Sequence, residues 1–249
     1  MSDRHPPAPP RTAMVLAAGL GLRLRPITET LPKPLVEVGG RALLDRILDR
    51  LVEAGVEKVT VNLHHLGSAI EAHLAPRLKP PIEFSPEAEL LETGGGVAKA
   101  LPRLGEGPFW VTNGDVLWLD GPKPALRRLA GAWDDARMDA LLLLHETVNA
   151  YGYQGRGDFL ADPLGRLTRR PECEVAPFLF TGVQILHPRL FADAPTGPFS
   201  LNRLYDEAIE KGRLYGVVHD GEWFHVGTQE GLAEAQAYLS VRYAAKEQR

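Results

Sequence analysis

Residues 13–23 read AMVLAAGLGLR. The apolar run over residues 13–18 is closed by a glycine, which is typical of a buried strand followed by a tight loop. Beyond this run, strand and helix patterns alternate as far as residue 144. The alternation predicts an α/β fold, with a mostly parallel sheet and helices on both of its faces. Ligands bind at the carboxyl ends of strands in such sheets, so the loop after residue 18 is the first candidate site.

The expected elements follow from apolar periodicity and from glycine stops. Helices are predicted over residues 41–54, 67–74, 94–101 and about 124–132. Strands are predicted over residues 56–62, 82–84, 109–112 and 140–144. After residue 151 the pattern changes to strands at 153–160, 167–170, 178–186 and 214–218 and helices at 202–211 and 229–239. With no internal repeat and no long linker, we expect one domain over residues 12–249 after a disordered, proline-rich tail at 1–11.

The composition narrows the classes of function. Lys and Arg total 28, Asp and Glu total 32, and the net charge is −4, which argues against a basic face for nucleic acid. The single cysteine, Cys173, excludes an internal disulfide and fits a reducing compartment. The apolar run at 141–144 is far shorter than the ~20 residues of a membrane span. We expect a cytoplasmic monomer or small homo-oligomer with neither a nucleic-acid nor a membrane partner.

The loop after the first strand combines small residues with cations. A dinucleotide-binding fingerprint would need a third glycine where Leu24 stands, and an acid near the end of the second strand, where Asn62 stands. An ordinary glycine turn with solvated arginines is the other alternative. However, Lys33 lies between two prolines that restrict its backbone, and Arg23 offers a planar set of donors for phosphate oxygens. A glycine turn beside two directed cations predicts a polyphosphate site.

Two segments in this region, LAAGLGLR (16–23) and PKPL (32–35), resemble the signature of sugar-1-phosphate nucleotidylyltransferases. The resemblance covers about residues 13–239. It implies a Rossmann-like fold with a mixed, mostly parallel sheet. It also implies a reaction in which a nucleoside triphosphate and a sugar-1-phosphate give a nucleotide-sugar and pyrophosphate, with Mg²⁺ as cofactor. By the same match, Arg23 and Lys33 would hold the phosphates. The nucleoside would lie against the loop residues Ala17, Ala18, Gly19 and Gly21.

A second loop, SPEAELLETGGGVAK (85–99), precedes a predicted helix. Three glycines at a helix start can expose N–H donors to a base or a ribose, whereas the alternative is a plain helix start with Thr93 as N-cap. The resemblance implies that this segment reads the base, with contacts from Glu87, Thr93 and Gly94. A carboxylate at Glu87 could accept the N3–H of uracil or thymine, or the N1–H of guanine, so the base stays open.

A third loop, VTNGD (111–115), follows the next strand. Asp115 places a carboxylate at the edge of the sheet, and Mg²⁺ prefers one or two carboxylates together with phosphate oxygens. The alternative is a turn aspartate that binds its own backbone. The resemblance implies that Asp115 is a metal ligand and that Asn113 lies at the nucleotide.

The segment WFHVGT (223–228) departs from the family pattern Trp-x-Asp-Val/Ile-Gly-Thr, in which the aspartate is a second metal ligand. His225 stands at that position. Three interpretations stay open: His225 ligates the metal, which would favour Mn²⁺ over Mg²⁺; it contacts a metal-bound water or a phosphate; or Asp115 alone carries the metal. A buried, hydrogen-bonded histidine without a functional role is the structural alternative.

The sugar half of the site is assigned by resemblance alone. The segments GRGDF (155–159) and FTGV (180–183) fall where relatives hold the sugar, which implies Gly157, Asp158 and Gly182 as sugar-binding residues. Within the family, the segments SPE (85–87), LETGGG (91–96), NGDV (113–116) and GRGDF (155–159) resemble those of N-acetylmuramate-1-phosphate uridylyltransferases, which implies UTP as the nucleotide. Mannose-1-phosphate guanylyltransferases are the near alternative. A non-catalytic nucleotide-sugar sensor is the alternative of another class, favoured by His225.

Overall fold

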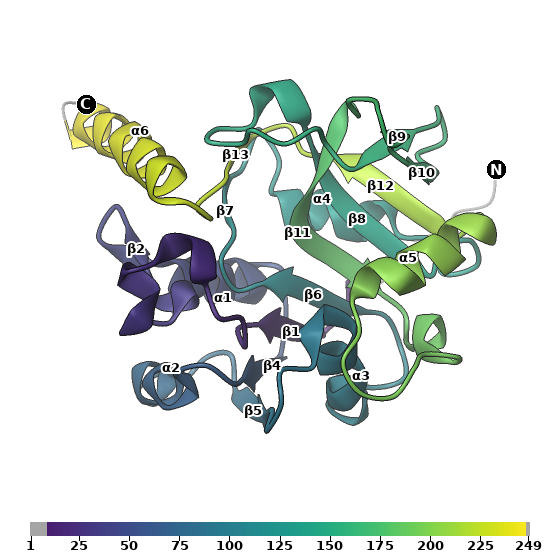
Figure 1. Ribbon diagram of the computed structural model, residues 1–249, viewed down its shortest axis with the longest axis horizontal. Coiled ribbons are helices and arrows are strands. Elements are labelled where there is room, and N and C mark those ends of the chain that lie inside the picture. Colours follow the sequence, from purple (N-terminus) through teal and green to yellow (C-terminus); the bar gives the residue numbers. More distant parts are fainter. Residues whose placement is uncertain (1–8, 248–249) are drawn as a thin grey trace.

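The computed structural model describes residues 9–247 and contains a mixed, mostly parallel central sheet (Figure 1). Its nine strands within the described residues are β1 (Thr12–Leu16), β4 (Lys58–Leu63), β5 (Ile82–Pro86), β6 (Phe109–Asn113), β8 (Ala140–Glu146), β9 (Phe159–Ala161), β10 (Leu167–Arg169), β11 (Phe178–Leu186) and β12 (Leu214–Val218). Strands β6, β1, β4 and β5 are adjacent and parallel. Strand β11 is antiparallel to β6 and β8, and β12 is parallel to β8. The predicted fold class is therefore confirmed.

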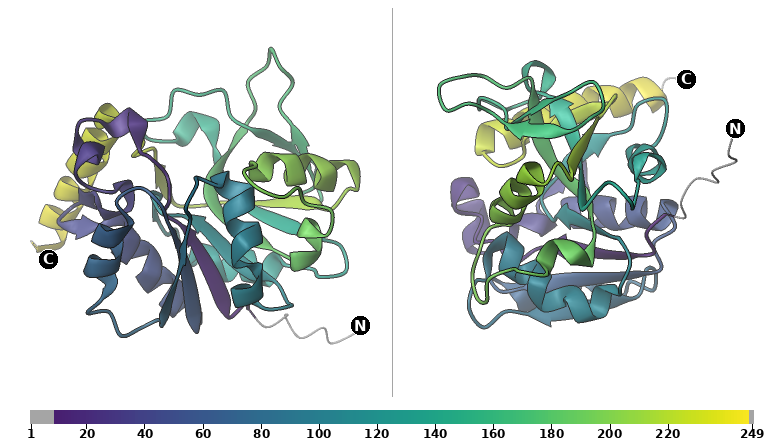
Figure 2. Two further views of the ribbon diagram at one scale, coloured as in Figure 1. Left: turned by 60° about the horizontal axis from the view of Figure 1, so that its bottom comes forward. Right: turned by 90° about the vertical axis from the view of Figure 1, so that its right-hand side faces the viewer.

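Helices cover both faces of the sheet, as Figure 2 shows. They are α1 (Leu43–Glu53), α2 (Gly67–Leu74), α3 (Glu92–Leu104), α4 (Ala125–Ala132), α5 (Leu201–Glu210) and α6 (Gln229–Glu247). Alternation along β1 explains the layering, because Ala13 and Val15 join the core under α1, α2 and α4 while Met14 joins the core under α3 and α5. Helix α6 packs on a smaller cluster with Leu24, Leu117 and Phe224.

Most expected elements are present within a few residues, and one expected strand is not. Residues 153–158 form a loop, and the strand there is limited to β9. Gly152 and Gly157 have φ values of 70° and 71°, a left-handed conformation that interrupts a strand. The hydroxyl of Tyr153 accepts a hydrogen bond from the N–H of Gly157 at 3.2 Å, which fixes the loop.

Several short elements were not predicted from the sequence. They are two strand pairs, β2 (Glu37–Val38) with β3 (Arg41–Ala42) and β7 (Leu117–Leu119) with β13 (Glu222–Phe224), and the 3₁₀ helices η1 (Leu22–Leu24), η2 (Ile27–Glu29), η3 (Lys33–Leu35), η4 (Thr147–Asn149) and η5 (Pro188–Phe191). Strands and 3₁₀ turns of two to four residues are too short to show a period. They matter here because η1, η3 and β13 carry or border the candidate site residues.

The chain packs against the sheet from Pro10 onward. The carbonyl of Pro10 accepts a hydrogen bond from the indole N–H of Trp110 at 3.0 Å, and that of Arg11 accepts one from the N–H of Glu57 at 2.7 Å. The tail expected over residues 1–11 therefore cannot include these two residues, and residues 1–8 lie outside the described part of the chain. Among the described helices, none has the length and apolar character needed to cross a bilayer.

Candidate active site

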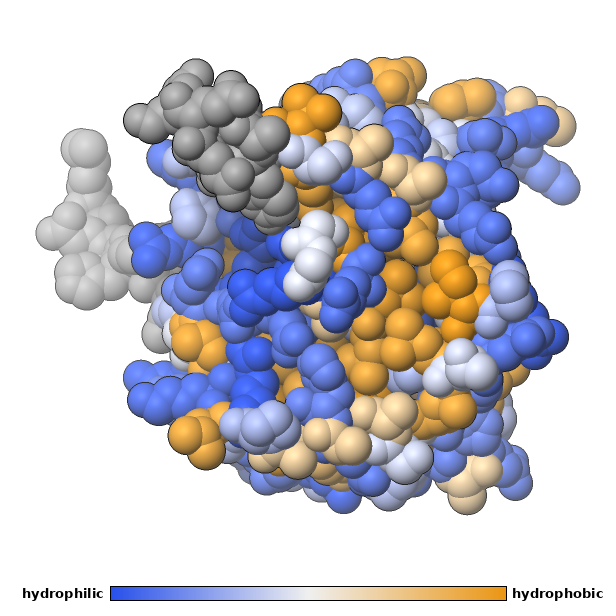
Figure 3. Space-filling view, turned by 90° about the vertical axis from the view of Figure 1, so that its left-hand side faces the viewer, coloured by the Kyte–Doolittle hydropathy of each residue, from blue (hydrophilic) through white to orange (hydrophobic). Residues whose placement is uncertain are grey.

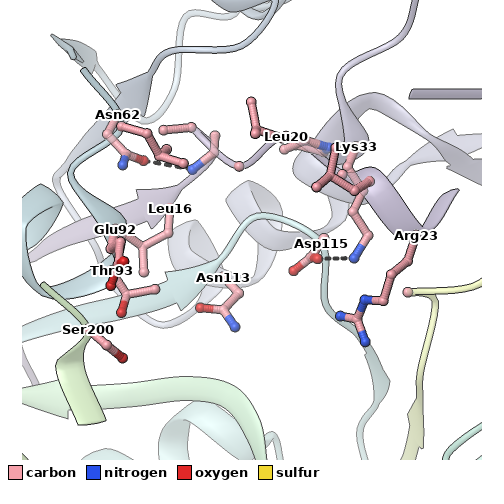
Figure 4. Close-up of a pocket in the computed structure, with 18 residues that line it drawn as sticks. Leu16, Leu20, Arg23, Lys33, Asn62, Glu92, Thr93, Asn113, Asp115 and Ser200 are labelled. Carbon is pink, nitrogen blue, oxygen red and sulfur yellow. Dashed lines mark hydrogen bonds and ion pairs between the residues drawn. The ribbon is translucent and has the colours of Figure 1, made fainter. Parts of the chain in front are cut away.

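A cavity of about 620 Å³ lies where three parallel strands end (Figure 4). The loop after β1 forms one wall, and Asn62 stands near the end of β4. Asn113 is the last residue of β6, and Asp115 follows that strand. The carboxyl ends of adjacent parallel strands meet at one edge of the sheet, so this is the position expected for a ligand. The predicted residues that line it are Ala17, Ala18, Gly19, Gly21, Arg23, Lys33, Thr93, Asn113 and Asp115.

The glycine loop is shaped for close approach of a ligand. Gly21 has a φ of 63°, and a Cβ there would lie 2.8 Å from Cγ2 of Thr28, so only glycine fits. A Cβ on Gly19 would meet no atom within 4 Å, which leaves open space beside that backbone. The N–H of Ala17 is already donated to Oδ1 of Asn62 at 2.7 Å. Backbone donors for a ligand must therefore come from Ala18 onward.

The three residues expected at the phosphates and the metal lie together at one end of the cavity. Lys33 opens η3 and its ammonium group forms an ion pair with the carboxylate of Asp115. The Arg23 side chain lies on the same side (Figure 4). Two cations and one carboxylate at the mouth of a glycine loop can hold a chain of phosphates together with a divalent ion.

His225 faces the same group of charges. Its Nε2 atom and Nη2 of Arg23 both lie close to Gly227, 2.7 Å and 3.5 Å from the position that a Cβ would take there. Burial, reinforced by the positive charges of Arg23 and Lys33, lowers the pKa of the His225 imidazole. The ring is therefore neutral at pH 7 and offers a lone pair or an N–H group.

The donor set fits a divalent ion that completes its coordination with substrate. Asp115 supplies a carboxylate oxygen, and no group of three or more Asp, Glu, His or Cys side chains within the described residues could enclose an ion without help. Mg²⁺ typically accepts one or two carboxylates and takes its other ligands from phosphates and water. A site of this kind would load its ion together with a nucleotide.

Glu87 is not placed at the cavity as expected. Its side chain is only 5% exposed. One carboxylate oxygen accepts from Nδ2 of Asn62 at 2.7 Å and the other from the N–H of Leu91 at 3.0 Å. Each oxygen thus accepts one hydrogen bond inside the protein, so Glu87 orients Asn62 and the loop before α3.

The three glycines at the start of α3 serve packing, contrary to the expectation that they expose N–H donors. The N–H groups of Gly94 and Gly95 both donate to the carbonyl of Phe199, at 2.8 Å and 3.1 Å. A Cβ on Gly94 would lie 2.3 Å from the Phe199 ring, and one on Gly95 would lie 2.4 Å from the carbonyl oxygen of Gly197. The glycines let residues 197–200 dock against α3, and this contact brings Ser200 into the cavity wall.

Comparison with known proteins identifies the family. The profile of the nucleotidyl transferase family matches residues 12–241. The chain belongs to this family. An N-acetylmuramate alpha-1-phosphate uridylyltransferase from Caulobacter vibrioides is 44% identical over 236 residues, which cover 93% of this chain and 98% of the relative. The catalytic subunit beta of a mannose-1-phosphate guanylyltransferase from Danio rerio is 29% identical, covering 94% of this chain and 67% of the relative.

Solved structures agree on the fold of this nucleotidyl transferase. A UDP-glucose pyrophosphorylase complexed with UDP-glucose superposes with a TM-score of 0.75 at 18% identity, covering 93% of this chain and 99% of that one. The family match favours the nucleotidylyltransferase interpretation of the glycine loop over the dinucleotide-binding one.

The residues expected at the sugar do not line the cavity, and only Gly182 lies close to a residue that does. A Cβ on Gly182, whose φ is 87°, would lie 2.8 Å from Nδ2 of Asn113, so β11 approaches the cavity closely there. The Asp158 carboxylate accepts from the N–H of Phe180 at 2.8 Å, and the carbonyl of Gly157 accepts from Nε of Arg170 at 3.1 Å. In this nucleotidyl transferase these two residues shape the loop beside β11.

Nine residues that line the cavity were not predicted as site residues, and Asn62, Glu92, Ser200 and Gly227 are among them. Asn62 carried a usable signal, because a polar residue near the carboxyl end of an apolar strand faces the ligand edge. Glu92 lay inside a segment already assigned to the nucleotide. Ser200 and Gly227 had no local signal, since tertiary contacts alone bring them to the loop after β1.

Proposed function

We propose that this nucleotidyl transferase couples UTP to N-acetylmuramic acid 1-phosphate, giving the nucleotide-sugar and pyrophosphate. The observation that carries the proposal is the convergence of Arg23, Lys33 and Asp115 at one end of a cavity on the sheet edge. The choice of substrates is supported by the uridylyltransferase relative, which is more similar over more of its length than the guanylyltransferase.

The reaction is an in-line displacement at the α-phosphorus of the nucleotide. An oxygen of the sugar phosphate forms the new bond to phosphorus, while the bond to the α,β-bridging oxygen breaks and pyrophosphate leaves with the electron pair. A phosphate monoester is largely ionised near pH 7, since its second pKa is about 6, so no general base is needed. Catalysis then depends on positioning and on neutralising charge.

Each charged side chain takes one part of that task. Arg23 stabilises the charge that grows on the leaving pyrophosphate, because its planar donors match phosphate oxygens. Lys33 bridges the α-phosphoryl group and the incoming phosphate as a compact charge. Asp115 would hold Mg²⁺, which when bound neutralises phosphate charge and orients the oxygens. His225, neutral beside Arg23, would contact a phosphate or a water on the metal.

The test is a matrix of nucleotides and sugar phosphates scored by pyrophosphate release. UTP, GTP, CTP and dTTP are each combined with the 1-phosphates of N-acetylmuramic acid, mannose, glucose and N-acetylglucosamine. We expect the fastest release with UTP and N-acetylmuramic acid 1-phosphate. Faster turnover with GTP and mannose 1-phosphate contradicts the substrate choice. Tight nucleotide-sugar binding without pyrophosphate from any pair identifies a sensor instead.

A further inference from the structure

The Arg23 side chain is placed by its backbone and not by contacts of its own. Within the described residues its guanidinium group makes neither a hydrogen bond nor an ion pair, whereas Lys33 is paired with Asp115 (Figure 4). Arg23 is the middle residue of η1, a single 3₁₀ turn. Because the side chain has no partner, the position of this turn decides where the guanidinium group can reach.

The two ends of η1 are held unequally by the loop itself. At the first end, the carbonyl of Gly21 accepts hydrogen bonds from the hydroxyl of Thr28 at 2.8 Å and from the N–H of Leu24 at 3.0 Å. The Leu24 side chain is buried in the apolar cluster on which α6 packs. At the second end, the N–H of Arg25 lies 3.4 Å from the carbonyl of Leu22, which is long for a hydrogen bond. The second end therefore needs support from elsewhere.

The side-chain amide of Gln229 supplies that support. Gln229 is the first residue of α6, and its Nε2 donates to the carbonyl of Arg25 at 2.7 Å, across 204 positions of the sequence. The start of α6 is itself fixed. The N–H of Gly231 donates to Oγ1 of Thr228 at 3.1 Å, and a Cβ on Gly231 would overlap the carbonyl oxygen of His225. The amide thus ties the end of η1 to a closely packed part of the chain.

We propose that Gln229 is a positioning residue that holds the carbonyl of Arg25 and so aims the Arg23 guanidinium at the phosphates. The inference rests on the proposed function, which gives Arg23 the leaving pyrophosphate, and extends it to a residue outside the cavity lining. Without the amide, η1 can turn about its buried Leu24, and the guanidinium spends less time in the productive position. One neutral hydrogen bond is worth a factor of about 3 to 10 in an equilibrium constant.

The experiment measures binding of inorganic pyrophosphate by calorimetry, with Mg²⁺ present and without nucleotide or sugar phosphate. Gln229→Ala removes the donor from an exposed side chain, so the Tm should stay within about 2 °C of wild type while the Kd for pyrophosphate rises about 3- to 10-fold. Gln236→Ala is the matched control. Gln236 is exposed on the same helix, and its Nε2 lies 3.5 Å from the carbonyl of Glu37, outside the cavity lining. This variant should keep the wild-type Kd.

A double-mutant cycle shows whether Gln229 acts through Arg23. Arg23→Ala should weaken pyrophosphate binding by more than Gln229→Ala does, because it removes the cation itself. Adding Gln229→Ala to Arg23→Ala should then cause no further loss, since the amide has no guanidinium left to aim. A purely structural role of Gln229 predicts the same loss in both backgrounds.

The outcomes separate this inference from the proposed function. An unchanged Kd in Gln229→Ala beside a clear loss in Arg23→Ala overturns the inference alone. So does an equal loss in Gln236→Ala, or an undiminished effect of Gln229→Ala in the Arg23→Ala background. No loss in Arg23→Ala refutes the role given to Arg23 and the inference with it. The expected coupling, without pyrophosphate release from any substrate pair, refutes the proposed function alone.

Discussion

The ion pair between Lys33 and Asp115 joins the side chain proposed to bind the phosphates to the side chain proposed to bind the metal ion. Lys33 follows the β1 loop and Asp115 follows β6, so their contact ties the glycine loop to the end of β6. Substrate phosphates would compete for Lys33, and a divalent ion would compete for Asp115. The pair thus holds both groups in position before substrate arrives.

Removing either partner should slow turnover far more than it affects folding. Lys33→Ala and Asp115→Asn should each lower kcat about 10²- to 10³-fold, because each deletes an electrostatic contact to reacting phosphates. Pyrophosphate release measures the effect, with Lys123→Ala, an exposed lysine outside the cavity lining, as the control. Near-wild-type turnover in both variants rules out the assigned roles.

The imidazole at position 225 should change which ion the enzyme prefers. His225→Asp adds a carboxylate near Asp115 and the two cations, and a second hard oxygen ligand favours Mg²⁺ over softer ions. We expect the Mg²⁺ concentration for half-maximal pyrophosphate release to fall about tenfold, with a smaller change for Mn²⁺. His225→Asn is the neutral comparison. An unchanged Mg²⁺ dependence in the aspartate variant means that residue 225 does not approach the ion.

At the scale of elements, the site depends on the seam between α3 and residues 197–200. Gly94 and Gly95 at the start of α3 admit this segment, which brings Ser200 to the cavity. The next residue, Leu201, donates its N–H to the Thr93 hydroxyl. The loop after β1, by contrast with this packed contact, exposes the apolar side chains of Leu20, Leu22 and Ile27. Figure 3 shows apolar patches among charged ones on the left-hand side of the molecule as drawn in Figure 1.

Gly95→Ala should push residues 197–200 away from α3. A Cβ there would lie 2.4 Å from the Gly197 carbonyl oxygen, and overpacking of this kind costs about 1–3 kcal/mol. Thermal unfolding should show a lower Tm, and KM for the nucleotide should rise as Ser200 shifts. Gly131→Ala in α4 is the matched control, since its Cβ would meet nothing within 4 Å and should stabilise the helix slightly. Equal Tm values for the two variants would argue against the seam.

At the scale of the whole molecule, the sequence predicted the strands, helices and loops that depend on the local pattern of apolar residues and glycines. Short apolar runs were sufficient for β1 and β6, and helical spacing of apolar residues was sufficient for the flanking helices. Loops after strands pointed to Arg23, Lys33 and Asp115 because sheet edges bind ligands. Glu87 shows what the sequence could not predict. Its carboxylate accepts hydrogen bonds from Asn62 and from the N–H of Leu91, and no local feature of the sequence reveals these contacts. The function of the glycines in α3 is hidden for the same reason, because their partner segment is about 100 residues away in the chain.

One buried and two half-buried histidines in separate parts of the fold should make stability fall as pH drops below neutrality. Burial is the main cause that lowers the pKa of His187, His219 and His225 in the folded protein. As pH drops below the unfolded value of about 6.5, the unfolded chain takes up protons that the folded chain does not, so stability is lost. One such group contributes a slope of at most about 1.4 kcal/mol per pH unit.

The measurement is Tm between pH 7.5 and 5.5 in wild type and in His219→Gln. His219 lies between strands, where one ring nitrogen contacts the Leu119 carbonyl at 3.0 Å, and glutamine keeps an N–H donor but cannot titrate. The wild-type Tm should fall toward pH 5.5, and the variant should fall less steeply. If both proteins lose Tm in parallel, carboxylates or the other histidines cause the decline and His219 does not contribute. If the wild-type Tm stays constant, burial does not lower the pKa of these three histidines in the folded protein.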